Sequence, residues 1–231
     1  MADKPILFSG SMIRAILREI HAPGTGKTQT RRVLKPQPEM MGDHGAWRWD
    51  RRQNGFAGSM GSHIQDFPRS ASFWCGYRPG DRLWVRETFR GDQEYDSYPP
   101  REWSHWPVHY EADEYGGVEN GRLRPSIHMP RWAIRLTLHV TDVRVQRLQD
   151  ISEADARAEG IEAREIVAIP DRGAVPETWW FGTGNGRVMA KSAFRDLWDS
   201  LNAERAPWDG NPWVVAVTFR PVLANIDRVA A

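Results

Sequence analysis

The fold is decided by residues 22–34, which read Ala-Pro-Gly-Thr-Gly-Lys-Thr-Gln-Thr-Arg-Arg-Val-Leu. Their Gly-Lys-Thr core looks like a phosphate-binding P-loop, a motif that needs a buried strand before it and a helix after it. The order here is reversed, because residues 11–20 place apolar side chains at helical spacing and residues 30–34 favour a strand. A P-loop also needs a glycine where this chain has His21, and no apolar strand ending in a Mg²⁺-binding Asp stands in a suitable place. The segment therefore indicates a loop from a helix into a strand and argues against an NTPase.

Length and composition predict one domain spanning residues 1–231, long enough to bury a sizeable core. No apolar run has the length of a membrane span, and the first residues lack the pattern of a signal peptide. Cys75 is the only cysteine, which excludes an intramolecular disulfide and a cysteine-based zinc site. We therefore expect a cytoplasmic protein, a monomer or a weak dimer, with no membrane partner, no cofactor and no metal.

The basic residues are unusual in kind rather than in number. The net charge is +1, yet 27 of the 31 basic residues are Arg, whose planar guanidinium grips phosphates and stacks on bases. A mutational bias toward arginine codons explains this equally well. Residues 1–40 carry seven basic side chains against three acidic ones, which places a modest basic patch around the Gly-Lys-Thr loop.

The remaining elements alternate between short strands and a few helices. Residues 82–87 read as a strand, and residues 108–111 are a weaker candidate. Residues 133–148 alternate between apolar and polar with a slip near Thr141, which predicts one bent strand or two strands joined at a bulge. Two stretches, at about residues 37–78 and 162–186, show no sustained period and are interpreted as insertions or long loops.

The last third of the chain has clear helix signals. Ser152 begins a capping box, so a short helix is expected to run to Glu159 and to stop at Gly160. Residues 190–201 form an amphipathic helix, and residues 213–219 a closing strand. Short strands of non-local pairing with two or three helices imply an α+β domain built on a small, mostly antiparallel sheet or barrel.

This order of motifs resembles the ASCH domain family, a group of PUA-like β-barrels, and more closely the branch that phages and prophages encode. The segments that carry the resemblance are residues 5–8, 26–32, 80–87, 126–132, 151–160 and 211–213. The resemblance implies an α+β fold with a small, mostly antiparallel PUA-like β-barrel flanked by two to three helices. The two irregular stretches have no counterpart in the smallest members of the family.

Some small ASCH proteins are acetylcytidine amidohydrolases, and the resemblance places their catalytic residues on Lys27, Thr30 and Glu159. Thr30 would be the nucleophile, Lys27 its base once desolvation lowers the lysine pKa, and Glu159 the acid that protonates the leaving amine. Residues three apart on a strand point to opposite faces, so Lys27 and Thr30 converge only if the loop turns at Gly26. Thr28 is the competing nucleophile.

Further residues are candidates for substrate binding, each with a structural alternative. Arg31 and Arg32 would contact substrate or phosphate, or carry charge at a strand edge, and Arg32 matches an Arg of the amidohydrolases. His128, Arg131 and Trp132 would line the barrel mouth, or form a structural corner. No second ligand stands at metal spacing from His128. The last candidate is Glu87, an acid at the end of a strand, which would face the pocket or pair with a nearby Arg.

Three functions compete. The first is metal-independent amide hydrolysis on an acylated pyrimidine nucleoside or nucleotide. The second is a module that binds RNA or a modified base without chemistry, whose affinity would fall steeply with salt. The third is a ribonuclease that stabilises phosphorane charge with Lys27 and the arginines. The expected partner is therefore a modified pyrimidine nucleoside or a nucleic acid, either RNA or phage DNA.

Overall fold

The computed structural model describes residues 2–41, 46–51, 56–60, 75–103, 107–113, 121–166 and 177–229. Its α-helices are α1 (Gly10–His21), α3 (Glu153–Ala158) and α4 (Ala190–Asn202). The main sheet contains β1 (Asp3–Leu7), β2 (Gln29–Val33), β6 (Arg82–Arg86), β9 (Thr137–Arg147) and β13 (Trp213–Val222). The smaller strands are β3 (Glu39–Met41), β4 (Ala46–Arg51), β5 (Phe56–Met60), β7 (Phe89–Arg90), β8 (His109–Tyr110), β10 (Glu162–Ile166), β11 (Glu177–Phe181) and β12 (Gly186–Arg187).

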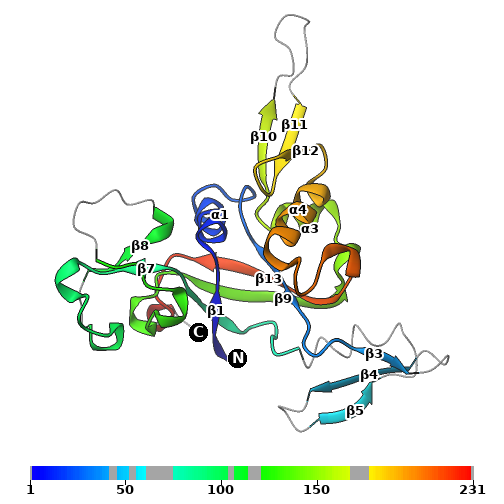
Figure 1. Cartoon of the computed structure of the whole chain (residues 1–231), viewed down its shortest axis with the longest axis horizontal. Coiled ribbons are helices and arrows are strands. Elements are labelled where there is room, and N and C mark those ends of the chain that lie inside the picture. Colours follow the sequence, from blue (N-terminus) through cyan, green and yellow to red (C-terminus); the bar gives the residue numbers. More distant parts are fainter. Residues whose placement is uncertain are drawn as a thin grey trace, which may run out of the picture.

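The centre of the fold is a five-stranded mixed sheet in the order β1-β6-β9-β13-β2 (Figure 1). Only β1 and β6 run parallel, and the other neighbours are antiparallel. The predicted α+β class is therefore confirmed. In the described residues the sheet does not close into a barrel, because β1 and β2 at its two ends do not pair. Arg32 of β2 nevertheless reaches across, and its Nη2 donates to the carbonyl oxygen of Leu7 in β1 at 2.5 Å.

The long strand β9 bends at the predicted place. Its register against β13 pairs Asp142 with Thr218 and Val140 with Phe219, which leaves Thr141 as an extra residue. An extra residue on one strand of an antiparallel pair is a β-bulge, which increases local twist. The alternation slip in the sequence is therefore a bulge within one continuous strand.

The helices pack on both faces of β13. Val215 and Val217 share a buried cluster with Ile13 and Ile16 of α1. Their neighbour Val214 belongs to a second cluster that contains α3 and α4 residues. Successive residues of a strand point to opposite faces, so α1 covers one face of β13 and the α3–α4 pair covers the other. None of the helices that the structure describes has the length and apolar character needed to cross a membrane.

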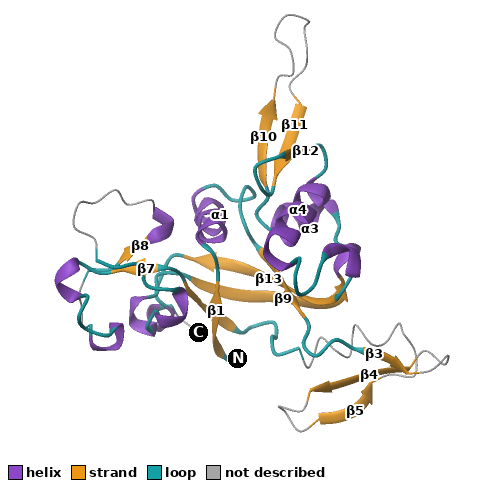
Figure 2. Cartoon of the chain, viewed as in Figure 1, coloured by secondary structure: helices purple, strands orange, loops and turns teal. Residues whose placement is uncertain are grey.

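The two stretches without sequence periodicity contain strands where they are described. β3, β4 and β5 form one small antiparallel sheet, and β10, β11 and β12 form another. Figure 2 shows the β10–β11 hairpin extending away from the main sheet beyond α1 and α4. The expectation of irregular loops was wrong for these segments, because strands such as residues 162–166, Glu-Ala-Arg-Glu-Ile, do not alternate strictly between apolar and polar residues.

Candidate functional site

The Gly-Lys-Thr loop folds back against α1 rather than leading into a helix. The Glu19 carboxylate accepts hydrogen bonds from the backbone N–H groups of Gly24 at 3.0 Å and Gly26 at 2.9 Å. Lys27 N–H donates to the Ala15 carbonyl at 2.9 Å. These are the amides that a P-loop would offer to phosphate, and a carboxylate already occupies two of them. The structure thereby supports the argument against an NTPase.

Lys27 and Glu159 form a buried pair. The Lys27 ammonium donates to Glu159 Oε2 at 2.6 Å and to the Glu159 backbone carbonyl at 2.8 Å. Lys27 is 0 % exposed and Glu159 4 %. Burial lowers the pKa of Lys27 below its usual range, and the guanidinium groups of Arg32 and Arg31 act in the same direction against the raising effect of Glu159. Burial and the ion pair with Glu159 thus act on the Lys27 pKa in opposite directions, and the effect of burial is the larger.

Helix α3 supplies a second carboxylate to the site. Ser152 caps this helix, its hydroxyl accepting from Asp155 N–H at 3.0 Å, as the capping box predicted. Arg31 donates from Nη1 to Glu159 Oε1 at 2.9 Å and from Nη2 to Asp155 Oδ2 at 3.2 Å. Arg144 also donates to Asp155, at 3.0 Å. The carboxylates of Asp155 and Glu159 lie one helical turn apart, so both face the guanidinium of Arg31.

Thr30 and Arg32 lie on the face of β2 opposite to Arg31, because successive residues of a strand point to opposite faces. Thr30 is 2 % exposed and makes no side-chain hydrogen bond within the described ranges. The Arg32 guanidinium lies 5.2 Å from the centre of the Phe8 ring, and the Lys27 ammonium lies 6.0 Å from the same ring. Phe8 therefore lies near both the Lys27 ammonium and the Arg32 guanidinium. No hydrogen bond joins Lys27 to Thr30 in the described residues, so the convergence of these two side chains stays a prediction.

A pocket of about 250 Å³ is lined by Thr30, Arg32 and Glu159, but not by Lys27 or Phe8. Residues 30–33 of β2 and Glu159 form one side, and the end of β1 with the start of α1 forms another. The facing wall is α4, through Phe194, Leu197 and Trp198. A second pocket, of about 290 Å³, shares Met12, Glu159 and Leu197 with the first and is also lined by residues of α1 and β11. Glu159 therefore borders both pockets, and Thr30 and both arginines border the first.

The structure places the other candidates elsewhere. Thr28 lines neither pocket, and its backbone N–H donates to the Ala158 carbonyl at 2.8 Å. Glu87 is buried and accepts two hydrogen bonds from Arg135, each at 2.9 Å. This is the ion-pair alternative weighed from the sequence.

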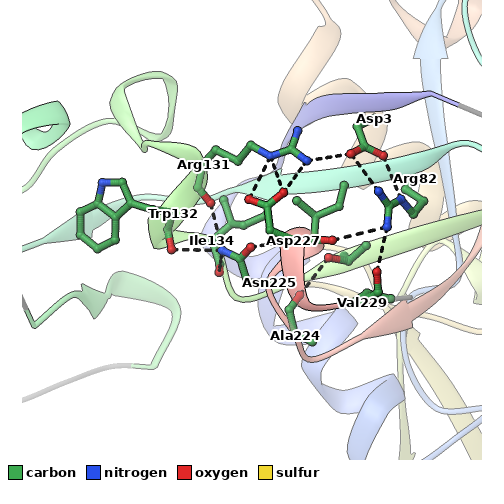
Figure 3. A network of polar contacts seen from close by, with 11 residues as sticks. Asp3, Arg82, Arg131, Trp132, Ile134, Ala224, Asn225, Asp227 and Val229 are labelled. Atoms are coloured by element: carbon green, nitrogen blue, oxygen red, sulfur yellow. Dashed lines mark hydrogen bonds and ion pairs between the residues drawn. The ribbon is translucent and has the colours of Figure 1, made fainter. Parts of the chain in front are cut away.

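His128, Arg131 and Trp132 are not brought to the pocket either. Arg131 donates to Asp3 and to Asp227, both at 2.7 Å, so it ties the first strand to a segment near residue 227 (Figure 3). The Asn225 side chain donates to the carbonyls of Arg131 and Trp132 in the same network, and Trp132 and His128 are exposed. The arrangement matches the structural corner rather than the barrel mouth.

Sequence reasoning missed the α4 wall, Phe8 and Asp155. The apolar stripe of α4 was recognised, but a stripe does not tell a core face from a pocket wall. Asp155 precedes Glu159 by four residues on a predicted helix, and this spacing was a usable signal. In the parts of the chain that the structure describes, no group of three or more His, Cys, Asp or Glu side chains is placed to hold a metal ion.

Comparisons with protein-family models, with curated proteins and with solved structures found no match for this chain. The similarity of its motifs to the ASCH family therefore stays a prediction. The functional argument rests on the site itself and on those motifs.

Proposed function

We propose that the protein hydrolyses the amide of an acylated pyrimidine nucleoside such as 4-acetylcytidine, with Thr30 as nucleophile, Lys27 as base and Glu159 as acid. The observation that carries the proposal is the buried Lys27–Glu159 pair, joined at 2.6 Å, whose Glu159 lines the same pocket as Thr30. Perturbed titratable groups in a cleft mark functional sites more often than chance. We also infer that the sheet is an opened variant of the PUA-like barrel, because Arg32 bridges its two end strands.

The proposed chemistry assigns one role to each of the three side chains. Neutral Lys27 takes the proton of the Thr30 hydroxyl as its oxygen attacks the acyl carbon. The C–N bond then breaks, and Glu159, having received a proton through Lys27, protonates the departing N4 amine. Water hydrolyses the resulting ester of Thr30, which releases the carboxylic acid and restores the hydroxyl. The Arg32 guanidinium borders the same pocket and is suited to stabilising the oxyanion.

Chromatography of 4-acetylcytidine incubated with the protein in EDTA tests this proposal. We expect conversion to cytidine and acetate, with rates at least about 10³-fold lower in Lys27→Ala and in Thr30→Val, because each removes a group of the nucleophile–base unit. The control is Thr178→Val, which removes an exposed hydroxyl on β11. If Thr28→Val abolishes conversion and Thr30→Val does not, the assigned nucleophile is wrong. If no conversion occurs and nucleic-acid affinity falls with salt, the binding module is the better description.

The pH dependence of hydrolysis gives an independent test of Lys27. Only the neutral amine accepts a proton, so kcat/KM should rise with pH and level off above the Lys27 pKa. Burial lowers the pKa of Lys27 from its usual 10.5, so the rise should be complete at a lower pH than a free lysine would give. The exposed lysine variant Lys35→Gln should leave the profile unchanged. A midpoint at or above 10.5 would contradict the role of Lys27 as base.

A further inference from the structure

The second pocket adjoins the proposed active site. It shares Met12, Glu159 and Leu197 with the first pocket, whereas Thr30 and both arginines of β2 line only the first. The rest of its lining comes from one face of α1, from the turn after α3 and from the end of β11. Small-molecule sites usually measure about 300–1,000 Å³, and the first pocket alone, at about 250 Å³, is smaller. The second pocket therefore offers room for a part of the substrate that the first does not hold.

One wall of the second pocket is positively charged. Arg14 and Arg18 are four residues apart on α1, so they lie on the same face of the helix, and both line the pocket. Arg18 is held in place, because its Nε donates to the Thr25 carbonyl at 2.8 Å and its Nη2 to the Gly160 carbonyl at 3.0 Å. Both acceptors are neutral, and no carboxylate forms an ion pair with Arg18 in the described residues. The neighbouring Glu19 instead accepts from backbone N–H groups of the loop.

The acids that line the second pocket are already bonded to other cations. Glu159 accepts from Lys27 at 2.6 Å. Glu162 accepts from Arg164 at 2.9 and 3.2 Å. These hydrogen bonds lower the Glu162 pKa, and the charge of Arg18 acts in the same direction. Because each of these acids has its own bonded cation, the charge of Arg18 remains available to an anion.

We propose that the second pocket binds an anionic group of the substrate, with the Arg18 guanidinium as its main contact. Glu159, the acid of the proposed reaction, borders both pockets, so this assignment rests on the proposed function. A guanidinium binds the oxygens of a carboxylate or a phosphate through charge-assisted hydrogen bonds. An acylated cytidine can carry such a group as a carboxylate at the end of the acyl chain or as a phosphate on the ribose. The substrate class is therefore an anionic acylcytidine.

Hydrolysis of matched substrates by the whole protein tests this inference. N4-glutarylcytidine is compared with N4-pentanoylcytidine, which has the same chain length without the carboxylate, and 4-acetylcytidine 5′-phosphate is compared with 4-acetylcytidine. Each reaction adds water across the amide C–N bond and releases the acid and the N4 amine. We expect kcat/KM to be at least about tenfold higher for the anionic member of at least one pair, because only that member forms the charge-assisted hydrogen bond. The pair that shows the preference identifies the anion as the carboxylate or the phosphate.

Variants of Arg18 assign the preference to the second pocket. Arg18→Gln removes the guanidinium, so the ratio of the two kcat/KM values should fall to about 1. Arg18→Lys keeps a positive charge and should retain part of the preference. The control is Arg220→Gln, which removes an exposed arginine outside both pockets and should leave the ratio unchanged. Should Arg18→Gln fail to fold, Arg18→Lys and the substrate comparison in the unaltered protein still decide the matter.

The outcomes separate this inference from the proposed function. Hydrolysis with equal kcat/KM within both pairs would overturn the inference and leave the function standing, and so would a preference that Arg18→Gln keeps. If no compound is hydrolysed, the same compounds serve as uncleaved probes in calorimetry. Tighter binding of an anionic member that Arg18→Gln abolishes would then support the anion site and remove the enzyme. Equal binding within both pairs without hydrolysis would overturn both.

Discussion

Replacing Glu159 with alanine is expected to lower the free energy of unfolding by about 3–5 kcal/mol, because a buried ion pair that loses one partner leaves uncompensated charge. Glu159 satisfies Lys27 at 2.6 Å and Arg31 at 2.9 Å, and both cations are buried. Lys27 can respond by losing its proton, but Arg31 cannot, and it keeps only the Asp155 carboxylate and the neutral Gln29 side chain as partners in the described residues. The variant should also lose the proposed hydrolysis. Equilibrium denaturation in urea, followed by tryptophan fluorescence, measures the loss of stability.

A matched variant separates the effect of removing a buried acid from the effect of removing any acidic charge. Glu162→Ala removes an acid that pairs with Arg164 at 2.9 Å, but both side chains are about half exposed. Such surface pairs contribute about 0–1 kcal/mol, so Glu162→Ala should stay within that range. Glu159→Gln keeps an acceptor for one of the two cations and should fall between the two variants. Equal effects of Glu159→Ala and Glu162→Ala would show that the buried pair does not support the fold.

Replacing Gly26 with alanine is expected to cost about 3 kcal/mol or more, the upper end of what overpacking costs. A Cβ at this position would lie 2.3 Å from the Ala15 carbonyl oxygen and 2.3 Å from the Glu19 backbone nitrogen. Both are backbone atoms of α1, so no flexible side chain can move aside. The loop must shift away from the helix, and it carries Lys27 with it. Hydrolysis should therefore fall together with the melting temperature.

The control for Gly26 is a glycine with free space. A Cβ at Gly184 would meet nothing within 4 Å, so Gly184→Ala should change stability by less than about 0.5 kcal/mol. Both variants are measured by thermal melting and by hydrolysis of 4-acetylcytidine. A Gly26→Ala protein as stable and as active as Gly184→Ala would show that the loop does not depend on close contact with α1.

Local patterns predicted the elements of the main sheet better than their arrangement. The helix at residues 11–20, the bulge at Thr141 and the cap at Ser152 each depend on residues that are neighbours in the chain. The parallel pairing of β1 with β6 joins segments some eighty residues apart, and no local period records it. The strands in the two insertions were missed because their sequences do not alternate strictly between apolar and polar residues, although strands such as β4 and β10 are at least as long as β2 and β6.

The candidate site shows the same difference between what local patterns predict and what long-range contacts arrange. Lys27 and Glu159 lie 132 positions apart, and the resemblance to a family, rather than spacing, brought them together as a prediction. Arg131 was expected beside them because it stands in a compact polar motif. Its partners Asp3 and Asp227 come from distant parts of the chain, and no sequence pattern around Arg131 predicts them.

The pairing of β2 with β13 has a consequence for synthesis of the chain. Ribosomes deliver the N-terminal segments first, so α1, the loop and β2 emerge well before residues 213–222, the partner of β2. Until then β2 exposes unpaired backbone on both sides, and such edges invite association with other chains. Strand β2 therefore stays without its partner β13 until nearly two hundred further residues have been translated. Chaperone protection of the nascent chain should matter most during that interval.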